Sequence, residues 1–257
     1  MRIATWNVNS VRARLPRVLD WLSEAQPDVL CMQELKCQEH QFPLEAFEDL
    51  GYNVAVYGQK SWNGVAIASR APLSGVITGI PDEDDPQARG IAAISGGLMI
   101  VNLYVPNGQE VGHEKYTYKL QWLDRLRDWL AGETTPDDDV VICGDFNICP
   151  DDRDVYDPEA WKDKILCSAP ERERFERLKA WGLIDAQRHF DDSPGLYTWW
   201  DYRAAMFRRG LGLRIDHHLV SASVLDRATG VEIDKEARKG EKPSDHAPVT
   251  LVLEGEA

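Results

Sequence analysis

The sequence lacks the features that mark membrane, secreted and zinc-binding proteins. No apolar run in its 257 residues approaches the roughly 20 residues of a bilayer-spanning helix. The five cysteines include no C-x-x-C pair, and Cys31 and Cys143 lie inside apolar stretches, which favours buried reduced thiols over disulfides or a zinc site. The first strand is expected to begin almost at Met1, which leaves no room for a signal peptide. We therefore expect a cytoplasmic protein without a membrane partner.

The chain also lacks a linker rich in Pro, Gly or Ser, a low-complexity segment and an identity repeat. Its length falls within the range that single α/β domains reach. A hydrophobic fraction of 43% and a charged fraction of 28% are ordinary for a soluble globular protein. We therefore predict a single domain over residues 1–257.

Basic residues are scarce relative to acidic ones. Lys and Arg number 29 against 43 Asp and Glu, for a formal net charge of −14, which argues at first against nucleic-acid binding, because cationic footprints dominate it. Part of the acid lies in runs at 82–85, 137–139 and 151–154 that are typical of solvated loops. The basic residues also cluster, and a fold that gathers them around one opening would give an acidic protein a positive rim. The clusters are Arg12, Arg14 and Arg17; Lys115 and Lys119; Arg203, Arg208, Arg209 and Arg214; and Arg238, Lys239 and Lys242.

Hydrophobic periodicity predicts an alternation of short strands and helices. After the first strand, apolar residues at 15, 18, 19 and 22 indicate a helix, and the strand that follows is expected in the same sheet. Further helices are predicted over about 43–50, 115–131 and 170–182. Further strands are predicted at 52–57, 64–69, 73–78, 90–94, 98–105, 197–200, 213–220, 228–234 and 247–253. Periodicity alone indicates a mixed α/β protein.

One stretch gives the clearest sign of a functional site. Val140 to Cys143 form an apolar strand, expected to be buried on both faces, that runs into Gly144-Asp145-Phe146-Asn147. In an extended chain, residues 145 and 147 point to the same side. The Asp145 carboxylate can hold a metal or take a proton from water, and the Asn147 amide can orient that water or bind a phosphate oxygen. On this segment alone, an Asx-turn that closes the strand is an equal alternative.

Five further apolar strands carry an acid, amide, phenol or imidazole at one end. Such groups are costly to bury unpaired, so a shared polar site is the economical explanation. Taken singly, each has a structural alternative as a strand end, a turn cap or a core aromatic, and His217 and His218 are expected to be structural or rim residues. The strand-end groups are Asn7, Glu34, Tyr104, Asp216 and the Ser244-Asp245-His246 segment.

Seven motifs in order resemble those of the exonuclease III family of apurinic/apyrimidinic (AP) endonucleases. They run from residue 5 to residue 246 and so cover nearly the whole chain. The resemblance implies an α/β fold, a four-layer sandwich of two mixed β-sheets packed face to face with helices outside, and a site at one end of the sheets. The motifs are Thr5-Trp6-Asn7-Val8-Asn9-Ser10, Gln33-Glu34-Leu35-Lys36, Leu103-Tyr104-Val105-Pro106-Asn107-Gly108, Gly144-Asp145-Phe146-Asn147, Thr198-Trp199-Trp200-Asp201-Tyr202-Arg203, Leu213-Arg214-Ile215-Asp216 and Ser244-Asp245-His246.

The residue types suit hydrolysis of a phosphodiester. That reaction needs a cation on a non-bridging oxygen, an activated water in line with the leaving oxygen, and stabilisation of the developing charge. Hard oxygen ligands suit Mg²⁺, with Mn²⁺ as a substitute, and Glu34 is the leading candidate ligand. Asp145 is expected to deprotonate the water, and His246, oriented by Asp216, to donate to a phosphate oxygen. Tyr104 is a further donor. The expected metal group is Glu34, Asn7, Asp145, Asn147 and Asp245, and Asn147 is also expected to hold the phosphate or the water.

A second group is expected to select the substrate. Residues 198–203 carry three aromatic side chains and one Arg, and flat side chains can enter a minor groove or stack on a displaced nucleotide. At least one of the two tryptophans is expected in the core. The resemblance implies that this segment lines a pocket for a flipped-out abasic sugar and that basic side chains lie near DNA phosphates. The expected substrate-binding residues are Arg89, Lys115, Lys119, Trp199, Trp200, Asp201 and Arg203.

These expectations lead to a Mg²⁺-dependent DNA repair phosphodiesterase. It would cut double-stranded DNA 5′ to abasic sites, trim 3′ ends as an exonuclease or 3′-phosphatase, and act as a monomer. One alternative keeps the scaffold but hydrolyses a small-molecule or lipid phosphoester, and the aromatic segment with its flanking basic residues argues against it. A second alternative is an inactive DNA-binding protein, which the intact polar set and the net acidity disfavour.

Overall fold

The structure, a computed structural model, describes residues 1–255 of the chain. Over this range the strands form two six-stranded sheets. No helix in the described part has the length and apolarity to cross a membrane. Sheet A consists of β1 (Arg2–Asn7), β2 (Val29–Gln33), β3 (Asn53–Tyr57), β4 (Val65–Ser69), β11 (Ala228–Ile233) and β12 (Val249–Leu253). Sheet B consists of β5 (Ser74–Thr78), β6 (Gly90–Ser95), β7 (Leu98–Tyr104), β8 (Val140–Asp145), β9 (Ile184–Asp185) and β10 (Asp216–Val220). The helices are α1 (Leu15–Ala25), α2 (Leu44–Glu48), α3 (Glu114–Glu133), α4 (Pro158–Trp161), α5 (Ala169–Trp181), α6 (Ala186–Phe190) and α7 (Ala222–Leu225), with 3₁₀ turns η1 (Glu39–Gln41), η2 (Asp152–Asp154), η3 (Arg203–Ala205) and η4 (Lys235–Arg238).

Each sheet has one parallel pair of strands at its centre. Sheet A runs in the order β11-β12-β1-β2-β4-β3, and sheet B in the order β5-β6-β7-β8-β10-β9. The pairs β1–β2 and β7–β8 are parallel, whereas the other neighbours are antiparallel. Helix α1 connects β1 to β2 and α3 connects β7 to β8, as parallel neighbours require a crossover. Both sheets are therefore mixed, as predicted.

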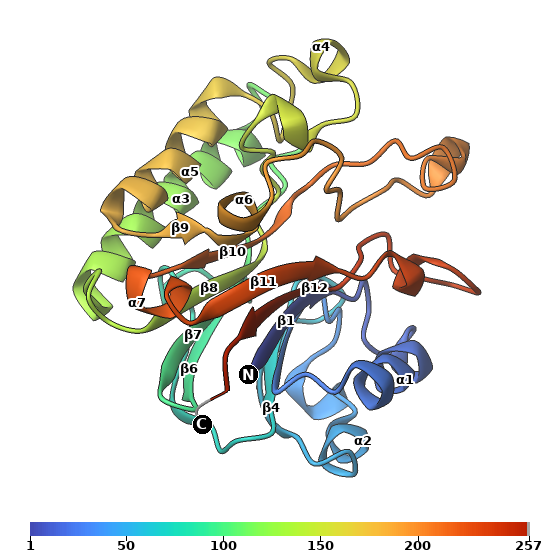
Figure 1. The fold of residues 1–257 in the computed structure, drawn as a ribbon, viewed down its shortest axis with the longest axis vertical. Helices are drawn as coiled ribbons and strands as arrows, with labels where there is room; N and C mark the ends of the chain where they lie inside the picture. Colours follow the sequence, from blue (N-terminus) through green and yellow to red (C-terminus); the bar gives the residue numbers. More distant parts are fainter. Residues whose placement is uncertain (256–257) are drawn as a thin grey trace.

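The sheets pack face to face, and the longer helices cover their outer faces (Figure 1). Apolar side chains of both sheets, including Ile3, Ile100 and Val141, form the core between them. A second apolar cluster lies between sheet B and helices α3 and α5, and a third lies between sheet A and helices α1 and α2. The strands buried on both faces, such as β2, β4 and β8, therefore carry continuous apolar runs. The predicted four-layer α/β sandwich is confirmed.

Two strand predictions need correction. Residues 197–200 form no strand, since Trp199 makes only isolated bridges to Leu213 and His246. The strand predicted over 213–220 begins at Asp216. Around residues 199 and 213 the two segments pair with each other only through isolated bridges, so local β-propensity there does not produce a regular strand.

The adjacent histidines of β10 are both buried, which fits a structural role and excludes a position on the rim. His217 packs edge-on against Phe146 and Phe175. Its Nε2 lies 2.9 Å from the carbonyl oxygen of Ile148. Burial lowers the pKa of His217 and that of His218 to about 4. Both side chains are therefore neutral in the folded protein at neutral pH.

We expect acid to destabilise the fold through these histidines. An unfolded His titrates near about 6.5, so between that pH and the folded pKa of about 4 the unfolded chain binds the proton and the folded chain does not. The contribution is fully present above about pH 6.5 and is lost as the pH falls towards 4, by up to about 3 kcal/mol for one histidine. Urea unfolding at several pH values should show a smaller loss for His217→Gln than for the wild type. Parallel pH profiles would contradict this assignment.

Candidate active site

Six strand ends meet at one edge of the two sheets. The carboxyl ends of the parallel pairs β1–β2 and β7–β8 point to this edge, and β10 and β12, which run antiparallel to them, begin there. The loops before β10 and before β12, drawn in orange and red, project from the same side (Figure 1). The residues at this edge line a cavity of about 510 Å³. Its polar lining residues are Glu34, Tyr104, Asn107, Asp145, Asn147, Asp201, Arg203, Asp245 and His246, and its aromatic and apolar lining residues are Tyr156, Trp161, Ile165, Leu166, Trp199, Met206 and Ile215.

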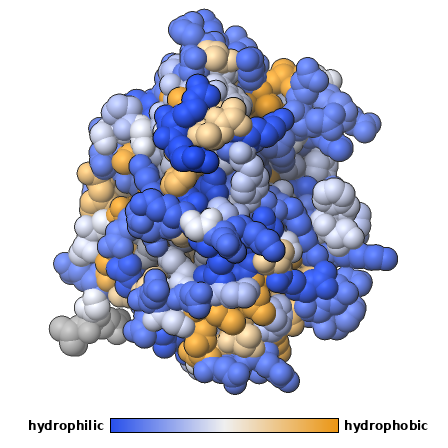
Figure 2. All heavy atoms as spheres, turned by 90° about the vertical axis from the view of Figure 1, so that its right-hand side faces the viewer, coloured by the Kyte–Doolittle hydropathy of each residue, from blue (hydrophilic) through white to orange (hydrophobic). Residues whose placement is uncertain are grey.

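The side of the molecule from which these loops project is mainly polar. Figure 2 turns it towards the viewer, and hydrophilic residues cover most of it, with apolar residues gathered mainly at its lower end. The exposed large apolar side chains of the described residues include Leu44, Trp62, Val76 and Phe190, which belong to different segments. A polar face suits a charged, hydrated substrate better than a lipid.

Three side chains that line the cavity bring potential metal-ligand atoms together. Ligand atoms of Glu34, Asp145 and His246 all lie within 4.8 Å of one another. The amide nitrogen of Asn7 donates to Glu34 Oε1 and to Asp145 Oδ2, each at 2.9 Å. The Asn7 oxygen instead accepts from the backbone N–H of Asn9 at 3.0 Å. Asn7 therefore fixes the two carboxylates and turns its own oxygen away from them, so the expectation that it ligates a metal directly is not supported by this geometry.

The Glu34 carboxylate forms an ion pair with Lys36. Glu34 follows directly after β2 in a left-handed conformation, with φ of 52°, which aims the side chain over the sheet edge. Its Oε2 lies 2.9 Å from Lys36 Nζ, and Lys36 also donates to Asn9 Oδ1 at 2.6 Å. In this arrangement the ammonium group neutralises the carboxylate. A bound cation would compete with Lys36 for it.

The Asp145 carboxylate accepts two hydrogen bonds and lies beside the His246 ring. Its Oδ1 accepts from the backbone N–H of Asn147 at 3.0 Å, and its Oδ2 lies 3.6 Å from His246 Nε2. Burial raises the pKa of Asp145 to about 7, an effect that His246 and Asn7 offset in part and that Asp216 and Glu34 increase. A carboxyl group with such a pKa is suited to accept a proton at neutral pH.

His246 and Asp216 form a buried pair. The Nδ1 atom of His246 lies 2.9 and 3.1 Å from the two Asp216 oxygens, and Thr198 Oγ1 donates to Asp216 Oδ2 at 2.6 Å. Burial disfavours the imidazolium, but the carboxylates of Asp216 and Asp145 outweigh burial and raise the pKa of His246 to about 10. His246 is therefore a cation at neutral pH, and its Nε2 lies among the cavity residues as a charged donor.

Tyr104 ends strand β7 beside Asp145, with which it is in register. Burial raises the pKa of its phenol well above the ordinary value, and the nearby Glu34 and Asp145 carboxylates raise it further. The Arg89 guanidinium lies 4.9 Å above its ring. The phenol thus stays protonated and available as a donor.

Asn147 reaches the cavity through a turn. Its φ of 50° is left-handed, and its backbone N–H donates to the Asp145 side chain in an Asx-turn. The Asx-turn named as the alternative for this segment is therefore present, and both side chains still line the cavity. Its Oδ1 accepts from Asn107 Nδ2 at 3.1 Å, and its Nδ2 donates to Val105 O at 3.0 Å. The extended geometry expected for 145–147 is wrong, but both side chains do lie at the cavity.

Asp245 lines the cavity outside the three-residue cluster. It accepts hydrogen bonds from Trp199 Nε1 and from Asn9 Nδ2, each at 3.0 Å. These contacts tie the loop before β12 to the ends of other segments. They leave Asp245 next to the candidate metal site rather than within it.

Of the predicted substrate-binding residues, three line the cavity, two line an adjoining groove, and two, Trp200 and Lys119, are buried. Trp199, Asp201 and Arg203 line the cavity, and Arg203 is held by Asp201 with its side chain 87% exposed. Arg89 and Lys115 line an adjoining groove of about 530 Å³ that shares Tyr104 and Asn107 with the cavity.

Trp200 and Lys119 require correction. Trp200 is 2% exposed and packs against Phe207, so it is the tryptophan expected in the core and does not reach a ligand. Lys119 is completely buried and paired with Glu171, so it cannot contact a DNA phosphate. Trp199, which precedes Trp200 in the chain, lines the cavity instead. Lys115, one helical turn before Lys119, lines the adjoining groove.

Sequence reasoning assigned no role to several residues that the structure brings to the site. Asn9, Lys36 and Asn107 contact the candidate site residues, as does Thr198. All four lie inside the motifs that carry the family resemblance, and that membership was the only available signal.

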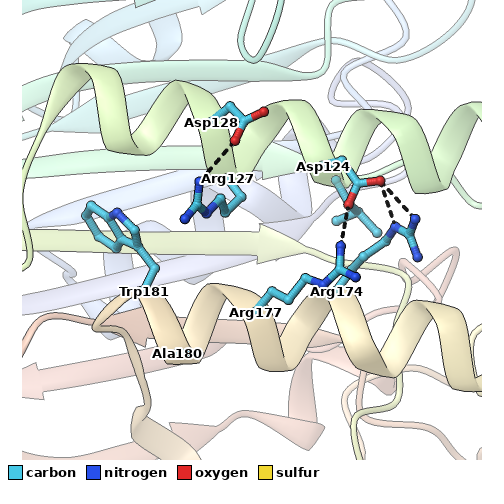
Figure 3. Close-up of a pocket in the computed structure, with 8 residues that line it drawn as sticks. Asp124, Arg127, Asp128, Arg174, Arg177, Ala180 and Trp181 are labelled. Atoms are coloured by element: carbon cyan, nitrogen blue, oxygen red, sulfur yellow. Dashed lines mark hydrogen bonds and ion pairs between the residues drawn. The ribbon is translucent and has the colours of Figure 1, made fainter.

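A second cavity, of about 430 Å³, lies between α3 and α5 (Figure 3). Its arginines are already paired: Asp124 binds Arg174 and Arg177, and Asp128 binds Arg127. It contains no residue of the strand-end cluster. It is an ion-paired groove between helices.

A two-sheet sandwich whose strand ends gather carboxylates, an amide, a phenol and an imidazolium defines a class, the metal-dependent hydrolases of phosphate esters. The profile described as "Endonuclease/Exonuclease/phosphatase family" matches residues 4–246, and the chain belongs to this family.

Relatives of known sequence and structure agree. Exodeoxyribonuclease III of Haemophilus influenzae is 36% identical over 97% of this chain and 98% of its own length, and an exodeoxyribonuclease of Bacillus subtilis is 33% identical over 98% and 99%. The solved 3′-5′ exonuclease NExo from Neisseria meningitidis is 45% identical with a TM-score of 0.97, over 99% of this chain and 100% of that one. An AP endonuclease from Archaeoglobus fulgidus is 38% identical with a TM-score of 0.95, over 99% and 100%.

Proposed function

We propose that the chain is a Mg²⁺-dependent DNA repair phosphodiesterase, acting as one catalytic domain. It cuts double-stranded DNA 5′ to abasic sites and removes nucleotides or phosphate from 3′ ends. The observation that carries the proposal is the Glu34–Asp145–His246 cluster beside a cavity with an apolar wall. The names of the relatives support it, as does a 3′ phosphatase NExo structure that is described as bound to a product DNA hairpin.

The donor set fits Mg²⁺. Glu34 and Asp145 offer hard carboxylate oxygens, and magnesium usually takes one or two of them while keeping several waters. His246 is protonated and bound to Asp216, so it faces the phosphate rather than the ion. When bound, the ion would neutralise charge on a non-bridging phosphate oxygen. Asn7 holds both carboxylates in place.

The other side chains divide the remaining chemistry. Asp145 takes a proton from the attacking water, for which its raised pKa suits it. His246 Nε2 and the Tyr104 phenol donate to the phosphate oxygens or to the leaving oxygen, where negative charge develops. Asn147 donates its remaining amide hydrogen to the phosphate or to the water. Asp216 keeps His246 charged and oriented.

The cavity wall suits a sugar that has lost its base. Trp199, Leu166 and Ile215 offer apolar surface beside the polar lining residues of the cavity. An abasic sugar has no base whose pairing must be broken, so it can leave the duplex and enter such a cavity at lower cost than a complete nucleotide. Arg203, together with Lys115 in the adjoining groove, supplies positive charge for the flanking phosphates. Both act locally in a protein whose net charge is −14, and Arg203 does so while paired with Asp201. Lys119 and Arg214, two other members of the predicted basic clusters, are buried in ion pairs and do not contribute.

We further propose a cytoplasmic monomer. All five cysteines are free and buried, which suits a reducing compartment. Size-exclusion chromatography with light scattering tests the oligomeric state.

The test of the proposal uses a duplex with one stable abasic analogue and a 5′ label. With Mg²⁺ we expect a single cut at the lesion and with EDTA none. A matched duplex with an ordinary nucleotide at the same position is the control, and a duplex with a 3′-phosphate reports on end processing.

Shortened products without a cut at the lesion would retain the chemistry and move the substrate to 3′ ends. Folded, metal-loaded protein that cleaves none of these DNAs would refute the proposal and favour phosphorylated small molecules.

A further inference from the structure

A buried lysine lies behind the candidate site and takes no part in the chemistry described so far. Lys119 belongs to α3 and Glu171 to the first turn of α5. Both side chains are fully buried, and Lys119 Nζ pairs with Glu171 Oε1. Lys119 Nζ also donates to the carbonyl oxygen of Asn147 at 2.6 Å and to that of Asn107 at 3.2 Å.

These contacts use all three donors of the ammonium group. A buried ion pair is an expensive way to stabilise a fold, because apolar residues of similar volume often do as well or better. Its two backbone contacts, however, go to the residues whose side-chain amides meet in the cavity: Asn107 Nδ2 donates to Asn147 Oδ1. Lys119 therefore binds the backbone carbonyls of the two residues whose side-chain amides line the cavity.

The local backbone explains why such contacts are needed. Asn147 has a left-handed φ of 50°, a conformation that non-glycine residues adopt at some cost and that surrounding contacts must maintain. Its N–H is bound to Asp145 and its carbonyl to Lys119. Removing the ammonium leaves this carbonyl without its donor, and the turn is then free to relax.

The carboxylate of the pair holds another segment that lines the cavity. Glu171 Oε1 accepts from the backbone N–H of Leu166 at 3.0 Å, and Glu171 Oε2 accepts from the N–H and hydroxyl of Ser168 at 3.1 and 2.6 Å. Leu166 lines the cavity. The pair thus connects the backbone of Asn147 to that of Leu166, two residues that line the cavity.

We propose that Lys119 is a positioning residue, which holds Asn147 and Asn107 so that the Asn147 amide meets the phosphate in the productive geometry. The proposal rests on the proposed function, since it assigns Asn147 a substrate contact. A displacement of about 1 Å at such a group can cost roughly 100-fold in rate. Lys119 itself does not contact DNA.

The test measures kcat, KM and salt dependence on the abasic duplex for three variants. Lys119→Met/Glu171→Gln removes both charges together, so no unpaired ion is left buried, and it retains an amide oxygen for the start of α5. We expect kcat to fall by roughly 100-fold, with KM, the salt dependence of DNA binding and the melting temperature near wild-type values. Tyr116→Phe is the matched control, because Tyr116 lies on the same helix as Lys119 and its hydroxyl contacts Ser168 Oγ at 2.7 Å but not Asn147. Its kcat should stay unchanged.

Lys115→Ala supplies the contrast for a true phosphate contact. It should raise KM and lower the salt dependence of binding by about one ion. The same pattern in the Lys119 double variant would make Lys119 a DNA contact and overturn the proposal. A folded double variant with wild-type kcat would also overturn it. If the wild type cleaves no DNA, the proposed function fails instead, and the melting temperatures still report whether the pair is structural.

Discussion

Asp145→Asn should lower kcat on the abasic duplex by roughly 1,000-fold or more, since a general base contributes about 10² to 10⁴ and we propose that this residue also holds the metal ion. Asn is isosteric and can still accept from the Asn147 N–H and face the Asn7 amide, yet it cannot take a proton from water. The buried site should also tolerate it, because removing a carboxylate whose pKa burial raises relieves desolvation.

The measurement is single-turnover cleavage at saturating Mg²⁺, beside binding of the abasic duplex and thermal melting. We expect DNA binding and melting temperature to be retained. The control is Asp49→Asn directly after α2, which makes the same substitution at an exposed carboxylate outside the site. Activity of Asp145→Asn within about tenfold of wild type would show that another group takes the proton.

His246→Gln should lower kcat by roughly 100- to 1,000-fold, the usual cost of removing one donor to developing negative charge. The imidazolium is held by Asp216 and lies 3.6 Å from Asp145 Oδ2. Gln keeps a neutral donor but loses the charge. We expect KM for DNA to change less than kcat, because the interaction strengthens as charge develops on the phosphate.

Asp216→Asn tests whether the positive charge of His246 matters separately from the presence of its imidazole ring. Because Asp216 and Asp145 raise the pKa of His246 to about 10, removing the Asp216 carboxylate should lower that pKa. The variant should then lose activity relative to wild type as the pH rises through and above neutrality, and approach it at acid pH. A pH–rate profile with a constant ratio to wild type at all pH values would contradict a charged His246.

The polar groups at the strand ends could be predicted from the sequence because only short stretches of chain are needed to recognise them. A strand buried on both faces is recognisable by its apolar run, and the groups at its end cannot be buried unpaired. Asn7, Tyr104 and Asp145 end their strands and Glu34 directly follows its strand. These four strands form the two parallel pairs, so the meeting of these residues at one edge followed from the crossovers alone.

The same reasoning failed where one chain position had to be chosen over a near neighbour. Trp199 and Trp200 are adjacent and chemically identical, yet one lines the cavity and the other packs in the core. Lys115 and Lys119 are one helical turn apart, yet one is exposed and the other fully buried. Local periodicity does not distinguish the tryptophans, because residues 198–203 form no regular element long enough to define an inner face. Lys119 does have the spacing of the buried Leu123, Leu126 and Leu130 on α3, but a lysine is expected at the surface unless a partner distant in the chain, here Glu171, pairs with it.

By itself, the sequence determined the α/β class, the strand ends that carry the reactive groups and the family to which their order belongs. These depend on the apolar pattern along the chain and on the side chains next to it. Only the tertiary structure decided which basic and aromatic residues face the cavity, that Asn7 supports the carboxylates, and that Lys119 binds Asn147. The reason is physical: burial and partnership depend on groups far away in the chain, such as Glu171 for Lys119, and no local pattern encodes that distance.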